Sequence, residues 1–147
     1  MEIFFASDHA GFDLKNQIIL NLNTSGFNVK DFGTNNLESC SYSDYAKLML
    51  NELAKLQSED PATKVENFGI LICGSGIGMS MVANRYRKIR AALCHNLETA
   101  KLSRQHNNGN VLCLGARQIE QNLGIEMVNI FLKTNFEGDR HAKRLNF

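Results

Sequence analysis

The fold of this chain is decided by residues 68–86, which read "FGILICGSGIGMSMVANRY". Residues 68–73 form a short apolar, β-branched run that is typical of a buried parallel strand, and residues 79–86 read as the opening of a helix. Cys73 therefore lies where a strand gives way to a helix. Three glycines stand at alternate positions after it: Gly74, Gly76 and Gly78. Glycines free the backbone to point successive N–H groups at one spot, so the stretch predicts a nest for an anion with a thiol at its edge.

Strands and helices alternate on both sides of this turn. Period-two and apolar runs predict five strands, at residues 2–6, 27–33, 68–73, 90–94 and 110–115. Helical periodicity predicts helices at residues 14–26, 79–86, 97–105 and 119–136, and one more between the second and third strands. The expected inward faces of two helices are Tyr45, Leu48, Met49, Leu53 and Leu56, and Ile119, Leu123, Met127, Ile130 and Phe131. This order predicts the α/β class: one Rossmann-like, three-layer α/β/α domain over residues 1–147, with a five-stranded parallel sheet that binds ligands beyond its carboxyl ends.

The composition narrows the class of partner. Sixteen basic and fifteen acidic residues give a formal charge of +1, which favours neither a nucleic acid nor a membrane surface, so we expect a small-molecule partner. The sequence has no apolar run of 18 residues and no leader-like start, which predicts a cytoplasmic protein. Four cysteines without paired spacing predict free thiols: Cys40, Cys73, Cys94 and Cys113.

The glycine turn does not match the nucleotide-binding motifs. Counted from Gly74 or from Gly76, a dinucleotide fingerprint would need glycine where Met79 or Met81 stands, and no Gly-Lys-Ser/Thr follows. A nucleotide-binding module remains an alternative from a different class. A purely structural turn around a buried cysteine is the other local interpretation.

Other side chains that could take part in binding or catalysis lie near strand ends or in the segments that follow. They are Asp8 and His9 after the first strand, His106 and Asn107 before the fifth, and Arg140 and Arg144 near the end of the chain. Each also has a plain interpretation, as a helix cap, a polar turn or a solvated face. Arg140 and Arg144 are four residues apart, which would place both side chains on one side of a helix and suit a phosphate.

Five segments in this order resemble one known family. They read "SDHAGFDLK", "DFGT", "GILICGSGIGMSMVANR", "LSRQHNNGNVLCLGAR" and "FEGDRHAKR". Their order and spacing make the chain similar to ribose-5-phosphate isomerase of type B, a family that includes the galactose-6-phosphate isomerase subunits. The segment around Tyr42 reads "SYSDY" where the family often has Asp-Tyr-Pro, which leaves the position of this loop open.

The resemblance implies a role for each matching residue. Cys73 would be the base that moves a proton between carbons 1 and 2 of the open-chain sugar, with Ser75 assisting. The backbone amides of Gly74, Ser75, Gly76, Ile77 and Gly78 would hold the enediolate oxygens. His106 would help to open the furanose ring. The remaining substrate contacts implied by the family are Asp8, His9, Tyr42, Asn107 and Arg117, with Arg140 and Arg144 on the phosphate.

The resemblance also implies the reaction and the assembly. It implies interconversion of ribose 5-phosphate and ribulose 5-phosphate in the pentose phosphate pathway, with a hexose 6-phosphate such as allose or galactose 6-phosphate as the alternative substrate. It implies a homodimer or a dimer of dimers with shared active sites, and no cofactor. No metal is expected either, because the four histidines show no ligand spacing with cysteine or carboxylate: His9, His95, His106 and His141.

Overall fold

The computed structural model describes residues 1–145. Its elements in chain order are β1 (Glu2–Ser7), the 3₁₀ turn η1 (His9–Gly11), α1 (Phe12–Thr24), β2 (Asn28–Asp31), α2 (Tyr42–Lys55), β3 (Phe68–Cys73), α3 (Ile77–Ala83), β4 (Ala91–Leu93), α4 (Leu97–Asn107), β5 (Val111–Gly115), α5 (Gln121–Lys133) and α6 (Asp139–Ala142). Strands and helices alternate, as the sequence predicts.

The five strands form one parallel sheet in the order β2-β1-β3-β5-β4. The chain first builds outward from β1 to β2 and then returns to add β3 on the other side of β1. Such a reversal of strand order leaves a crevice at the carboxyl ends of the two central strands. Ser7 of β1 pairs with Ile72 of β3, and Cys73 pairs with Gly115 of β5, so the cysteine reaches the sheet edge beside this crevice.

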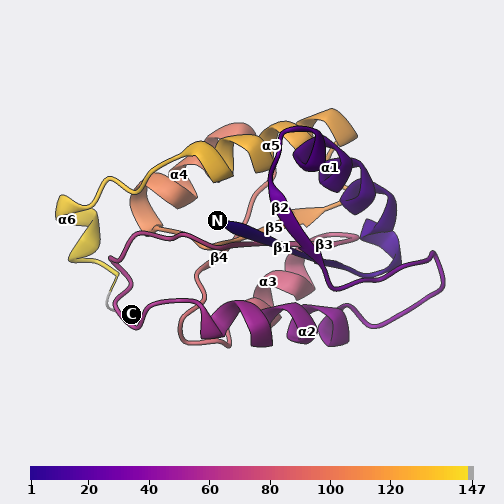
Figure 1. Cartoon of the computed structure of the whole chain (residues 1–147), viewed down its shortest axis with the longest axis horizontal. Coiled ribbons are helices and arrows are strands. Elements are labelled where there is room, and N and C mark those ends of the chain that lie inside the picture. Colours follow the sequence, from indigo (N-terminus) through magenta and orange to yellow (C-terminus); the bar gives the residue numbers. More distant parts are fainter. Residues whose placement is uncertain (146–147) are drawn as a thin grey trace.

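Helices cover both faces of the sheet (Figure 1). Alternate residues of β1 serve the two cores: Ile3 and Phe5 pack with α1, α4 and α5, whereas Phe4 and Ala6 pack with α2 and α3. A strand buried on both faces needs this continuous apolar run, because successive side chains point to opposite sides. The three-layer α/β/α fold with a five-stranded parallel sheet is therefore confirmed.

The expected inward face of α2 is partly wrong. The buried side chains of this helix are Ala46, Met49, Leu50 and Leu53. Leu48 and Leu56 are about half exposed, at 53% and 50%. Leu48 lies off the single stripe that the helix packs against the sheet, and Leu56 follows the last residue of the helix, so apolar character alone placed both on the wrong side.

Some element ends also differ from the prediction. The first helical turn after the cysteine begins at Ile77 instead of residue 79, and the long last helix stops at Lys133 instead of residue 136. After Lys133 the chain runs extended, and the backbone N–H of Glu137 donates to the carbonyl of Gln105 at 3.0 Å. This contact with α4 replaces the last helical turn that periodicity predicted.

A buried lysine fastens the segment after β2 to the end of β1. The side chain of Lys15 is fully buried, and its Nζ donates to both carboxylate oxygens of Asp31 at 2.8 and 2.6 Å and to the carbonyl of Thr34 at 2.7 Å. The Thr34 N–H in turn donates to the Ser7 carbonyl at 2.8 Å. A buried ammonium needs such partners, since an unpaired buried charge is costly. The clamp fixes the backbone that leads into Asp8.

Across residues 1–145, none of the helices has the length and apolar character needed to span a membrane.

Candidate active site

The site begins at the cysteine turn, which we define as residues 73–78. Cys73 ends β3 with only 4% of its surface exposed, and its Sγ accepts the backbone N–H of Gly76 at 3.2 Å. Gly76 adopts a left-handed backbone conformation with φ of 77°, and a β-carbon built there would lie 2.9 Å from the backbone of Leu114. Only glycine satisfies both demands. The turn thus holds the sulfur atom in a fixed position at the sheet edge.

The amides of the turn are only partly used inside the chain. Gly76 donates to the cysteine sulfur, and Ile77 donates to Oγ of Ser75 at 3.3 Å. In the described part of the chain, the amides of Gly74, Ser75 and Gly78 have no acceptor. Backbone N–H groups seldom stay unpaired, so these three are the ones available to a ligand.

Two side chains from other elements lie directly on the glycines. A β-carbon built at Gly78 would be 2.5 Å from Cζ of Tyr42, and one built at Gly74 would be 3.1 Å from Nη1 of Arg117. The backbone of Arg117 is tied to the same turn, because its N–H donates to the Gly74 carbonyl at 3.0 Å. The segment with the unusual "SYSDY" sequence opens α2 and brings its tyrosine to the cysteine turn.

Asp8 and His9 enter the same region from the end of β1. The Asp8 N–H donates to the Ile72 carbonyl at 3.2 Å, one residue before the cysteine. The carboxylate also caps η1, where Oδ1 accepts from Ala10 and Gly11 at 2.9 and 3.1 Å. His9 presents Nδ1 to the backbone N–H of Cys40 at 3.2 Å.

His106 and Asn107 lie at the amino-terminal ends of the strands, which is the opposite edge of the sheet from Cys73 at the carboxyl ends. They end α4 just ahead of β5, and the nearby Asn110 carbonyl accepts from Gly69 at the start of β3. The six residues of β3 span about 20 Å between the two edges. Within one chain, the structure does not bring this segment to the carboxyl ends of the strands, where Cys73 lies. The reason is topological: a crossover helix runs antiparallel to its strands, so its last residues return to the amino-terminal edge.

Arg140 and Arg144 lie near His106 at that same edge. Figure 1 shows α6 at the left end of the long axis, beyond the start of β1. The expected helix carrying both arginines is wrong in its length, because α6 ends at Ala142 and Arg144 follows in a turn. Both side chains are exposed.

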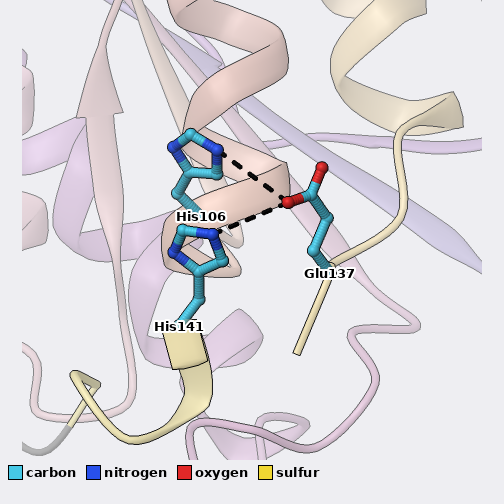
Figure 2. Close-up of side chains that lie close together, drawn as sticks. All are labelled: His106, Glu137 and His141. Atoms are coloured by element: carbon cyan, nitrogen blue, oxygen red, sulfur yellow. Dashed lines mark ion pairs between the residues drawn. The ribbon is translucent and has the colours of Figure 1, made fainter. Parts of the chain in front are cut away.

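A second group of titratable side chains forms what we call the histidine cluster: His106, Glu137 and His141. The Nε2 atoms of the two rings lie 3.9 and 3.6 Å from Oε2 of Glu137, and Figure 2 shows both rings turned toward this one carboxylate oxygen. The expectation of no metal site rests on the spacing of the histidines along the sequence, and the structure adds a carboxylate beside His106 that this spacing does not show. Glu137 and His141 are four residues apart, a spacing that could have revealed half of the cluster.

The surroundings of His141 are dominated by burial and positive charge. Desolvation lowers the pKa of His141, and the positive charges of His106, Arg140 and Arg144 lower it further, while Glu137 alone raises it. The ring stacks on that of His106 with centroids 4.3 Å apart. A charge on the neighbouring His106 ring therefore disfavours a charge on His141, since like charges at this distance repel.

The other cysteines differ from Cys73 in their setting. Burial raises the pKa of the Cys94 thiol, and burial also raises that of Cys113, where the neighbouring Cys73 and Cys94 add to the effect. All four cysteines are free thiols. A buried thiol with a raised pKa is unreactive, which marks Cys94 and Cys113 as core residues.

A cavity of about 510 Å³ lies at the amino-terminal edge, away from the cysteine turn. Its wall includes Phe68 and the buried Arg104, whose pKa is lowered to about 10 by desolvation and by the charge of Arg90. Arg104 stacks on the Phe68 ring at 4.9 Å and donates to the Gly109 carbonyl. These contacts give the arginine a structural role.

The fold and the turn together define an open parallel α/β protein with an anion nest and a held thiol at its central crevice. Residues 3–147 match the family described as "Ribose/Galactose Isomerase". The chain is 38% identical to ribose-5-phosphate isomerase B of Escherichia coli (strain K12), over 98% of this chain and 91% of that protein. The chain belongs to the ribose/galactose isomerase family.

Solved structures agree with this assignment. The crystal structure of ribose-5-phosphate isomerase B from Mycoplasma genitalium with bound ribulose-5-phosphate gives a TM-score of 0.90 at 43% identity, covering 99% of this chain and 91% of that chain. Ribose-5-phosphate isomerase B from Clostridium thermocellum gives 0.89 at 39% identity, with 99% and 93% covered. The resemblance carried by the five sequence segments is confirmed.

Proposed function

We propose that this chain is an aldose-ketose isomerase that interconverts D-ribose 5-phosphate and D-ribulose 5-phosphate, the reaction of the pentose phosphate pathway. The observation that carries the proposal is the sulfur of Cys73, held by a glycine amide beside three amides without an acceptor. The M. genitalium relative binds ribulose-5-phosphate, which supports the same class of substrate for this chain. The isomerase domain then spans residues 1–147.

The reaction needs a base and donors for the developing charge. In the open-chain aldose, Cys73 takes the proton from carbon 2, and the electron pair moves through the carbonyl to leave an enediolate with negative charge on oxygen. The proton returns to carbon 1 and gives the ketose, so no atom and no electron is gained or lost. The amides of Gly74, Ser75 and Gly78 suit this oxygen charge, and each such donor contributes about 3–4 kcal/mol in comparable sites. The Ser75 hydroxyl assists proton exchange at those oxygens.

Around the turn, the remaining groups bind the sugar. Asp8 and His9 contact its hydroxyls from the end of β1, while Tyr42 and Arg117 close over the glycines. His106 opens the furanose ring and Asn107 completes the contacts. Arg140 and Arg144 bind the phosphate, for which the planar guanidinium is well suited. No cofactor or metal takes part in this scheme. We therefore expect that adding a chelator will not lower the turnover rate.

We further propose that the site is shared between two copies of the chain, in a homodimer or a dimer of dimers. The support is the separation of Cys73 from His106 at opposite sheet edges, which leaves neither half complete. Beside the turn, α3 exposes Ile77 and Met81 on one face, at 48% and 63%. Exposed apolar side chains next to a half-site suit a covering partner. Free thiols and the small-molecule reaction fit the cytoplasm, where we place the protein.

Kinetic measurements with three sugar phosphates test the function. We expect the highest kcat/KM for ribose 5-phosphate and lower values for allose and galactose 6-phosphate. A hexose 6-phosphate is the second candidate because the matching family covers galactose as well as ribose isomerases. A pocket separates substrates that differ by one carbon by only about 1–3 kcal/mol, so the ratio must be measured. The proposal would be overturned if the chain isomerised none of the three sugar phosphates.

A further inference from the structure

The histidine cluster includes two groups, Glu137 and His141, that have no part in the isomerase reaction proposed above. It brings two imidazoles and one carboxylate together, and their ligand atoms all lie within 4.8 Å of one another. Two histidines and a glutamate form one of the ligand sets that hold zinc in proteins with a fourth position open. We propose that His106, Glu137 and His141 bind a late transition-metal dication, Zn²⁺ in particular, and that the bound ion inhibits the isomerase. The inhibition rests on the proposed function, whereas the binding does not.

The distances suit an ion after a small contraction. Zinc bonds of about 2.1 Å in a tetrahedron separate neighbouring ligand atoms by about 3.4 Å. The two nitrogen-to-oxygen distances here are 3.6 and 3.9 Å. The protein atoms therefore need to move by only a few tenths of an ångström at the carboxylate.

The rings require the larger adjustment. They are stacked almost parallel, at 9°, so their Nε2 lone pairs run side by side and do not meet at one point. One ring must tilt out of the stack. The His141 side chain is 9% exposed and stays fixed, whereas the His106 and Glu137 side chains are 38% and 48% exposed and have room to move.

The backbone holds the three ligands in place before any ion binds. The Glu137 N–H donates to the Gln105 carbonyl at 3.0 Å, which fixes the glutamate beside the residue preceding His106. The His141 N–H donates to the Gly138 carbonyl at 2.8 Å and starts the turn that carries His141 back over Glu137. A site built on such constraints loses less conformational entropy on binding.

Nearby arginines decide which ions bind. The Arg140 Nε donates weakly to His141 Nε2 at 3.5 Å, and an ion would displace this contact. Arg140 and Arg144 repel any cation, and Glu137 offers the single negative charge. Hard cations such as Mg²⁺ depend on oxygen ligands and charge, so they should not bind. Zn²⁺ and Co²⁺ gain covalent stabilisation from neutral imidazole, which favours them at a site with little net negative charge.

Binding is tested by titrating Co²⁺ into the full chain and recording the visible absorption of the bound ion. We expect one Co²⁺ per chain, displaced by Zn²⁺ and unaffected by excess Mg²⁺. Glu137→Gln should weaken binding by at least about tenfold, because even indirect partners of a metal cost that much when removed. Glu126→Gln is the matched control, an exposed glutamate on α5, and should bind as the wild type does.

Two outcomes overturn the site. One is equal Co²⁺ affinity in the wild type and Glu137→Gln, with folding of both verified by circular dichroism. The other is a near-ultraviolet thiolate-to-cobalt band, which would assign the ion to a cysteine. His141→Gln provides a second variant, and it should also weaken binding at least about tenfold.

Inhibition is tested separately with Zn²⁺ and ribose 5-phosphate. We expect Zn²⁺ to inhibit the wild type reversibly, with full recovery on adding a chelator, and Glu137→Gln to need at least about tenfold more Zn²⁺. Unchanged sensitivity of Glu137→Gln would overturn the inhibition. If the chain isomerises no sugar phosphate, the proposed function fails while the cobalt titration still decides the site.

Discussion

The cysteine turn and the histidine cluster are built in opposite ways. In the turn, the backbone fixes the chemistry: Cys73 is buried, a glycine amide holds its sulfur, and Tyr42 and Arg117 lie on bare glycines. In the cluster, side chains at the end of α4 and around α6 provide the chemistry. Two of these three side chains, His106 and Glu137, are partly exposed. The two regions lie at opposite sheet edges of one chain. One region is thus rigid and the other adjustable, and in the shared site that we propose they would form its rigid half and its adjustable half.

The largest effect should come from the rigid half. Cys73→Ala should lower kcat by about 10²- to 10⁴-fold, the usual contribution of a positioned base, and leave the substrate Kd nearly unchanged because the thiol acts in proton transfer. The Kd is measured by calorimetry and kcat by a coupled assay. Cys94→Ala is the matched control, a buried cysteine in the other core, and should keep wild-type kcat. Substantial turnover by Cys73→Ala would reject the cysteine base.

The second prediction joins the two halves directly. Cys73→Ala and His106→Ala chains are refolded together and assayed as a mixture. With shared sites, each hybrid dimer has one site with both defects and one with neither. Random exchange makes half of the dimers hybrids, so roughly a quarter of all sites should recover from two nearly inactive parents. Native mass spectrometry counts the hybrids. Hybrids without recovered activity would mean that each site belongs to one chain.

A smaller effect is expected at the phosphate end. Arg140→Gln and Arg144→Gln should each raise KM by about 10- to 100-fold with little change in kcat, because a charge-assisted hydrogen bond contributes about 1.5–3 kcal/mol. Inorganic phosphate should compete with substrate in the wild type and compete less well in both variants. Arg87→Gln, at an exposed loop arginine, is the control. If KM stayed constant in both variants, another group would have to bind the phosphate.

Much of the rigid half could be predicted from the sequence, and much of the adjustable half could not. A short apolar run before three spaced glycines specifies local geometry, so the place of Cys73 and its turn followed from neighbouring residues. The edge at which His106 lies depends on the direction of a whole helix. The approach of Glu137 depends on a hydrogen bond to Gln105 across 32 positions of sequence. Local patterns carry no record of such contacts.

Burial of polar groups shows the same limit. Lys15 lies in a helix with evident apolar spacing, yet nothing in that spacing indicates that its ammonium is fully buried against Asp31. Leu48 and Leu56 show the opposite: their side chains are apolar, yet they are exposed in the isolated chain. Periodicity reports which residues are apolar, whereas burial also depends on which partner covers each face.

The smallest effect tests how closely the rigid half is packed. In Gly78→Ala the new methyl group would lie 2.5 Å from Cζ of Tyr42, so the ring must leave its place over the turn. Tyr42 begins α2 and is 42% exposed, so it can swing outward at a cost of about 0.5–1.5 kcal/mol. We expect KM to rise by about two- to tenfold. The free energy of unfolding should change little, because alanine in the first turn of α3 contributes about 0.5–1 kcal/mol and the displaced ring costs a similar amount.

A double-mutant cycle with Tyr42→Ala separates the ring from other effects of the methyl group. If the ring transmits the change, Gly78→Ala should alter KM in the wild type and have no effect once Tyr42 is alanine. The stability gain from the helix should appear in full only in the Tyr42→Ala background, where no ring has to move. An undiminished KM effect in the Tyr42→Ala background would mean that the methyl group acts on the amide of Gly78 itself. The turn would then be more sensitive than its packing against Tyr42 indicates, and the amide would be the donor on which substrate binding depends.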